Sequence, residues 1–126
     1  MAIRADIPPS EEWFTGEDRV LEFTIYQRDG VTVQDISGWE LSWFLKRSKK
    51  DADADAVLTK TNSGSPADIT IVDGPNGRVD VLVAAADTLA LVARVYRHEL
   101  KRMDTGEKTI ESYGDATLQQ ALHRSA

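Results

Sequence analysis

Cysteine is absent from this chain of 126 residues, and histidine occurs only twice. Without thiols the protein cannot form disulfides, use a thiolate as a nucleophile or hold zinc through sulfur. No apolar run approaches the roughly 18 residues that a membrane-spanning helix needs, so we expect no membrane partner. The first residues also lack the apolar region of a secretory signal, which predicts a protein made in the cytoplasm.

Basic residues are in the minority, with 15 lysines and arginines against 21 aspartates and glutamates, and the net charge is −6. Proteins that bind nucleic acid gain most of their affinity by neutralising phosphates with Lys and Arg. The one basic cluster, residues 46–50, is followed directly by the acidic segment 51–55, which cancels much of its field within about 8–10 Å. The sequence therefore predicts no nucleic-acid partner.

Motifs for catalysis and for cofactor binding are missing as well. The chain has no glycine-rich phosphate loop and no G-x-S-x-G nucleophile elbow. His98 lies in an alternating segment, where a hydrogen-bonded structural role is the commoner one, and His123 lies among the last residues. We therefore expect no enzyme and no cofactor.

The spacing of Asp51, Asp53 and Asp55 resembles the start of a calcium-binding loop. An EF-hand also needs a glycine at its sixth position and a glutamate at its twelfth. Those positions hold Ala56 and Asn62, so the motif fails twice. We expect no metal site, and whether the three aspartates bind a cation weakly stays open.

Period-two alternation dominates what the chain does contain, and it is typical of half-buried β-strands. Asp29-Gly30 and the segment 74–77 are turn signals of the kind that join two strands in a hairpin. The predicted strands are residues 19–28, 31–36, 39–46, 57–61, 69–72, 78–83 and 109–118. The residues predicted to build the core are Leu21, Phe23, Ile25, Trp39, Leu41, Trp43, Val79, Val81, Tyr96 and Leu100.

The tryptophan-rich segment 39–46 is either a core strand or part of a ligand site. Its large apolar side chains fall at every second position, and on a strand these share one face. We therefore predict a core strand. Phe44 falls on the opposite face, where it is either covered by another segment or offered to a partner. A sugar-stacking platform built from Trp13, Trp39 and Trp43 remains the rival interpretation.

Residues 84–103 allow two interpretations, because they contain neither glycine nor proline. A helical period of 3.6 fits the apolar positions tolerably and is slightly favoured. The same stretch can also be divided into a short helical turn at 85–91 and a strand from 94 to 103. In that strand Tyr96, His98 and Leu100 share a face.

Several segments taken in order resemble a small β-sandwich of tailed-phage virion proteins, similar to the N-terminal domain of baseplate upper proteins. The segments are "DISGWELSWFLK", "VLTKT", "ITIVDGPNGRVDVLVAAADTLAL" and "YRHEL". The resemblance covers about residues 18–120 and lies in the order of elements rather than in any catalytic signature. It implies an immunoglobulin-like β-sandwich of about seven strands, with a short helical crossover near 85–91 followed by a strand. The chain departs from the pattern at residues 92–94, where a Pro-Gly turn would be expected.

The resemblance predicts a non-enzymatic structural protein of the virion. It would dock on neighbouring virion subunits in the tail, neck or baseplate, and form a homo-oligomer within the particle. One alternative is a decoration protein that stabilises the capsid. Another is a carbohydrate-binding module for attachment to the host surface.

Three regions are expected: an extended N-terminal arm at 1–18, the sandwich domain at 19–118 and a C-terminal tail at 119–126. Pro8 and Pro9 favour an extended path that cannot complete a β-ladder. We expect the arm to dock on neighbours, and its first 15 or so residues to be removable without loss of the fold. The candidate interaction residues are Pro8, Pro9, Trp13, Phe14 and Phe44.

Overall fold

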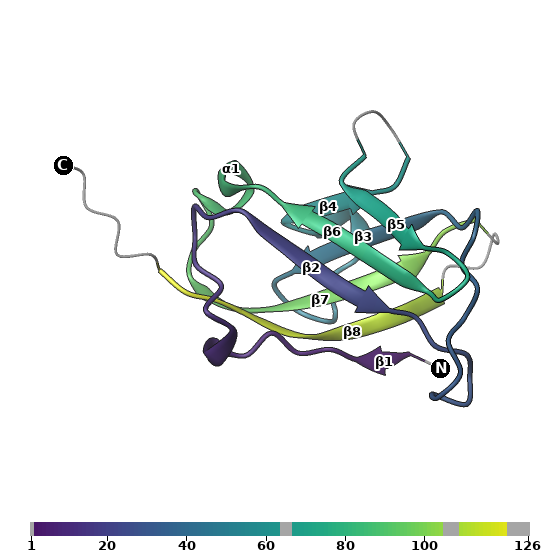
Figure 1. Ribbon diagram of the computed structural model, residues 1–126. Coiled ribbons are helices and arrows are strands. Elements are labelled where there is room, and N and C mark those ends of the chain that lie inside the picture. Colours follow the sequence, from purple (N-terminus) through teal and green to yellow (C-terminus); the bar gives the residue numbers. More distant parts are fainter. Residues whose placement is uncertain (1, 64–66, 105–108, 121–126) are drawn as a thin grey trace.

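Two β-sheets pack face to face in the computed structural model and form a β-sandwich (Figure 1). The structure describes residues 2–63, 67–104 and 109–120. The strands are β1 (Ile3–Arg4), β2 (Arg19–Thr24), β3 (Leu41–Lys46), β4 (Leu58–Thr61), β5 (Ile69–Asp73), β6 (Arg78–Val83), β7 (Arg94–Arg102) and β8 (Thr109–Leu118). Three helical turns complete the elements, namely η1 (Pro9–Glu11), η2 (Asp53–Asp55) and α1 (Ala85–Thr88). The predicted all-β sandwich is confirmed.

The strands divide into a five-stranded sheet with the order β1-β8-β7-β3-β4 and a three-stranded sheet with the order β2-β6-β5. Neighbouring strands are antiparallel, except that β1 runs parallel to β8. The chain passes from β6 in the small sheet to β7 in the large one through α1. The short helical crossover is therefore correct, and the continuous helix over 84–103 that periodicity favoured is wrong.

The core lies between the sheets and follows the predicted alternation. On β2 and β6, Leu21 is paired with Val81 and Phe23 with Val79, and all four side chains are buried. Trp43 at the centre of β3 is fully buried. Burying a ring of its size removes roughly 150–250 Å² from water, which stabilises the fold by about 4–6 kcal/mol at most.

One predicted core residue, Trp39, lies at the margin instead. It precedes β3 and is half-buried, and the guanidinium carbon of Arg102 lies 3.8 Å from the centroid of its ring. The alternation places Trp39 on the core face, but β3 begins only at Leu41, and Trp39 packs against the border of the core. The other nine predicted core residues are buried.

The two predicted hairpin turns have different outcomes. Residues 74–77 connect β5 and β6 as expected, and Gly77 has a φ of 69°. A side chain at Gly77 would also meet the carbonyl oxygen of Ile25 at 2.5 Å, so glycine is required there. The turn at Asp29-Gly30 forms, but beyond it Tyr26 and Val33 make an isolated bridge rather than a ladder, and the predicted strand 31–36 is wrong.

Candidate functional site

The N-terminal segment is a strand of the large sheet rather than a free arm (Figure 1). It runs alongside β8 in parallel. The amide of Ile7 donates to the carbonyl of Asp115 over 2.8 Å, and the amide of Thr117 donates to the carbonyl of Ile7 over 2.8 Å. Further along, Gln119 exchanges backbone hydrogen bonds with Trp13 and Thr15, at 2.8 and 2.9 Å. The segment therefore covers the edge of β8 along most of its length.

Two side chains anchor this segment in the core. Ile7 is 7% exposed and Trp13 is 1% exposed, and both belong to the main hydrophobic cluster. The expectation that residues 1–18 form an arm separate from the sandwich is wrong, because these two side chains help to close it. For the same reason, removal of residues 1–15 is no longer expected to leave the fold intact.

Gly114 of β8 permits the close approach of the N-terminal segment. A Cβ atom at this position would lie 2.7 Å from the carbonyl oxygen of Ala5 and 2.6 Å from Oδ1 of Asp6. On the neighbouring strand β7, His98 is paired with Gly114. The absence of a side chain at Gly114 thus lets the backbone of Ala5 reach the imidazole of His98.

His98 connects the N-terminal segment to the core. Its side chain is fully buried, and Nε2 is hydrogen-bonded to the carbonyl oxygen of Ala5. Nδ1 accepts a hydrogen bond from Nε1–H of Trp43 over 3.3 Å. Both contacts are satisfied only by the neutral ring with its proton on Nε2. Burial lowers the pKa of His98, against the opposite effects of the Ala5 hydrogen bond and the Asp6 carboxylate.

A slot of about 200 Å³ opens between the N-terminal segment and β2. One wall is formed by five consecutive residues of β2, Arg19 to Phe23, and the other by residues 5–7 and Glu11. His98 also lines the slot. Arg19 binds the Glu11 carboxylate over 2.9 Å and the Glu11 carbonyl oxygen over 2.7 Å, which ties the two walls together at one end.

Acidic side chains gather on the outer face of the small sheet next to the slot. Glu22 of β2 is paired with Asp80 of β6, and neither carboxylate has a hydrogen bond or an ion pair among the described residues. Like charges directly opposite each other on neighbouring strands destabilise a sheet. The adjacent cross-strand pair is apolar and exposed, formed by Val20 and Leu82.

The outer face of the large sheet carries a buried charge network. Nζ of Lys46 lies 2.8 Å from Oε1 of Glu99 and 2.7 Å from Oδ1 of Asp53, and Nζ of Lys101 lies 2.7 Å from the same Asp53 oxygen. The ring of Phe44 lies beneath, with both lysine nitrogens 5.6 Å from its centroid. These contacts hold η2 against β3 and β7.

The candidate interaction residues therefore have different surroundings. Phe44 is 4% exposed and Trp13 is buried, so neither presents a surface to a partner, and this part of the expectation is wrong. Pro8 and Pro9 are exposed at the start of η1. Phe14 is half-buried and bridges to Gln119. Four of the five thus lie together along β8, whereas Phe44 lies on the outer face of the sheet.

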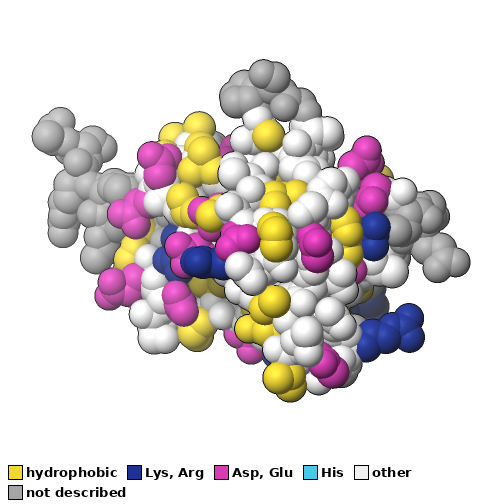
Figure 2. All heavy atoms as spheres, turned by 45° about the vertical axis from the view of Figure 1, so that its right-hand side comes forward, with side chains coloured by type: hydrophobic (Ala, Val, Ile, Leu, Met, Phe, Trp, Pro, Cys, Tyr) yellow, Lys and Arg dark blue, Asp and Glu magenta, His cyan; other side chains and the backbone are white. Residues whose placement is uncertain are grey.

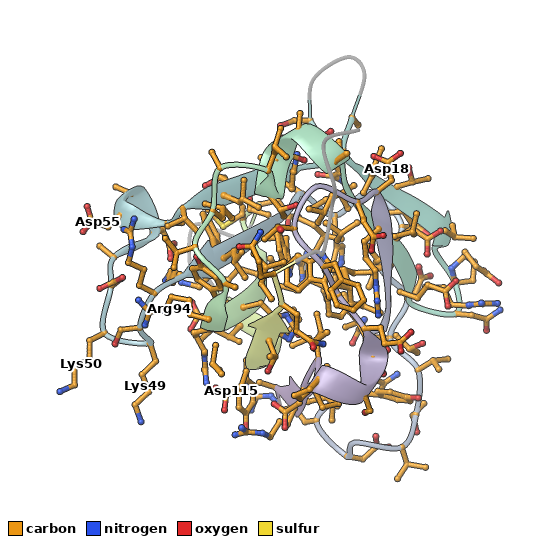
Figure 3. All side chains as sticks on the ribbon, turned by 90° about the vertical axis from the view of Figure 1, so that its left-hand side faces the viewer. Asp18, Lys49, Lys50, Asp55, Arg94 and Asp115 are labelled. Carbon is orange, nitrogen blue, oxygen red and sulfur yellow. The ribbon has the colours of Figure 1, made fainter. Side chains whose placement is uncertain are left out.

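The three aspartates of the calcium-like spacing do not converge. Asp53 is held by two lysines, and these interactions lower its pKa although burial opposes them. In Figure 3, Asp55 projects away from the sandwich at the same corner as Lys49 and Lys50. Within residues 2–63, 67–104 and 109–120, no cluster of three or more His, Asp or Glu is arranged to hold a metal ion.

The tryptophans do not form an exposed platform for a sugar. Trp13 and Trp43 are buried, and Trp39 is half-buried beneath the guanidinium of Arg102. On the face drawn in Figure 2, hydrophobic side chains form several separate groups with acidic side chains between them. That face offers no continuous apolar patch of the kind that marks a large interface.

The sequence indicated a hydrogen-bonded structural role for His98, but neither its partners nor the slot. Alternation with Tyr96 and Leu100 indicated that His98 faces inward, but nothing in the sequence indicated that its partner is Ala5, 93 positions away. His123 and most of the predicted tail, residues 121–126, lie outside the described residues. Within the part of the chain that the structure describes, no helix is both long and apolar enough to cross a membrane.

Comparisons with protein families and with curated proteins identify no relative of this chain. A scan against protein-family models gives no match, and a search of curated proteins gives none either. The similarity to baseplate upper proteins therefore stays a prediction based on the order of the strands.

Proposed function

We propose that this protein is a non-enzymatic structural component of a tailed-phage virion that docks on neighbouring subunits in the tail, neck or baseplate. The observation that carries the proposal is the N-terminal segment, which binds the edge of β8 through backbone hydrogen bonds. This chain thus already joins an extended segment to a sheet edge. Assembly through such edges needs strand geometry and a few anchoring side chains, and no catalytic group.

Free edges support the same role. β2 and β5 bound the small sheet and β4 bounds the large one. Strand edges present unpaired backbone groups that pair with other chains unless they are blocked. Oligomerisation with further copies in the particle and the immunoglobulin-like assignment of the sandwich belong to the same proposal.

The proposal is tested on particles purified from cells that carry the gene. Quantitative mass spectrometry and gold-labelled antibodies should find the protein in particles at a fixed number of copies, on the tail, neck or baseplate. Its absence from particles, when the lysate contains it, would overturn the proposal. Labelling over the head surface would instead favour the capsid decoration protein.

The carbohydrate-binding alternative is disfavoured by the position of the tryptophans, since only Trp39 reaches the surface and Arg102 covers it. A glycan array with the full chain should show no binding. Binding that is lost in Trp39→Ala but retained in Arg102→Ala would favour the carbohydrate-binding module.

A further inference from the structure

The free edge of β2 lies beside the slot. β2 pairs with β6 on one side only. In an antiparallel ladder, every second residue directs its N–H and C=O toward one neighbour, and the residues between direct theirs to the other side. About half of the backbone groups of this six-residue strand therefore face the slot and solvent.

The core residues beside this slot are not completely closed off from it. Ile7, Leu21 and Phe23 line it and are 7%, 5% and 8% exposed. These are the three highest exposures among the buried hydrophobic residues of the described chain. An apolar side chain that entered from outside would complete the burial of all three.

The charges around the slot select for a basic segment. Arg4 pairs with Asp6 and Arg19 pairs with Glu11, so each of these charges has a partner of opposite sign. Glu22 and its cross-strand neighbour Asp80 have no such partner. A lysine or arginine directly opposite Glu22 on an added strand would lie on the same outer face and relieve the repulsion between the two carboxylates.

We propose that the slot is the docking site for an extended, basic segment of a partner protein, which adds to β2 as a fourth strand of the small sheet. Apolar side chains of the segment point inward to Leu21 and Phe23, and alternate basic side chains lie beside Glu22. A second copy of β2 fits less well, because it brings another Glu22 to an edge that is already acidic. The inference rests on the proposed docking role, since it names the surface and the chemistry of the partner.

The experiment uses the full chain and three capped hexapeptides in NMR titrations. The first alternates lysine and valine, the second alternates glutamate and valine, and the third is the first with its alternate amides methylated. The lysine peptide should shift the amide signals of residues 5–7 and 19–24. The other two should bind at least about tenfold more weakly, because one repels the acidic edge and the other cannot pair with β2.

Matched variants separate the local effect from the overall charge. Glu22→Lys should weaken binding of the lysine peptide by about threefold to tenfold. Glu40→Lys, an exposed change of the same charge that precedes β3 in the other sheet, should leave the affinity within about twofold.

Several results would overturn the inference. These are shifts confined to β4 or β5, equal binding of all three peptides, no binding, or a dimer that pairs through β2. The particle experiment is independent of these results. Loss of peptide binding with the protein still in particles refutes only this site, whereas absence from particles refutes the virion role.

Discussion

The indole of Trp43 donates a hydrogen bond to Nδ1 of His98 across 3.3 Å in the interior of the sandwich. The opposite ring nitrogen holds the carbonyl oxygen of Ala5 in the N-terminal segment. The imidazole, carried by the middle strand β7, thus joins β3 to the N-terminal segment at the edge of the large sheet. This arrangement fixes one tautomer of His98. A hydrogen on Nδ1 would point at the indole N–H, and two donors cannot form a hydrogen bond with each other.

Stability should fall as the pH is lowered from about 7 to 5. Burial first, and the charge of Arg97 to a smaller degree, lower the pKa of His98, whereas Ala5, Asp6 and Asp115 act in the opposite direction. The folded pKa lies below the ordinary value of 6.5, so the unfolded chain binds the proton more readily. The stabilisation is complete above that value and is lost as the pH falls toward the folded pKa.

Urea unfolding between pH 5 and 7.5 measures this dependence. The variant His98→Gln does not titrate and should reduce the slope of the unfolding free energy in this range. The carboxylates with lowered pKa, among them Asp6, lose their stabilisation only as the pH falls below their ordinary value of 3.8. A slope that His98→Gln leaves unchanged would contradict the prediction.

Trp43→Phe should cost more stability than Trp13→Phe, although both indoles are buried. The first change removes the donor to His98 and leaves Nδ1 buried without a partner, which costs about 1–3 kcal/mol. Nε1 of Trp13 has no hydrogen-bond partner in the structure, so the second change loses packing alone. Denaturant unfolding of the two variants side by side gives the difference, and equal losses would show that the Trp43–His98 hydrogen bond contributes nothing.

The strands that form the sandwich were predictable because each has one face in the core. β2 and β6 show the alternation that a single buried face imposes on a strand, and β3 shows it in its large apolar residues although its outer face is covered as well. The segment 84–103 shows the limit of this reasoning. Its apolar residues fit both periods, and the hydrogen bonds of β7 to β3 and β8 decide between them. Such long-range pairing is not visible in a local pattern.

The candidate site was harder to predict because its parts meet only in the folded chain. Pro8 and Pro9 indicated an extended path, but no pattern indicated that this path would follow β8. Phe44 looked exposed on the outer face of β3, yet Lys46 and Lys101 cover it through an ion network with Asp53. The alternation alone placed the Phe44 ring at the surface, but the side chains of Lys46 and Lys101 bury it.

Gly114→Ala should loosen the N-terminal segment without disturbing the small sheet. The new methyl group would clash with the carbonyl oxygen of Ala5, so the segment must move away and its contact with His98 must lengthen. We expect the free energy of unfolding to fall by about 1–3 kcal/mol. Hydrogen exchange should accelerate at the amides of Ala5 and Ile7 and stay unchanged at Val81. Uniform acceleration would mean that the segment is not a separable unit.

Glu99→Gln should destabilise the protein by about 1.5–3 kcal/mol, because it replaces a charge-assisted hydrogen bond to a buried lysine. Lys46 would retain Asp53 but lose its more deeply buried partner. Adding Lys46→Met removes the cation that has lost this partner, so the double variant should be more stable than Glu99→Gln alone.

Denaturant unfolding of the single and double variants forms a double-mutant cycle that measures the coupling between Lys46 and Glu99. Asp104→Asn is the control, because its ion pair with Arg102 is more exposed and its loss should change the stability less. Losses that simply add in the double variant would show that Lys46 and Glu99 are not coupled. In that case, the ion pairs of Asp53 with Lys46 and Lys101 would hold η2 over Phe44 without a contribution from Glu99.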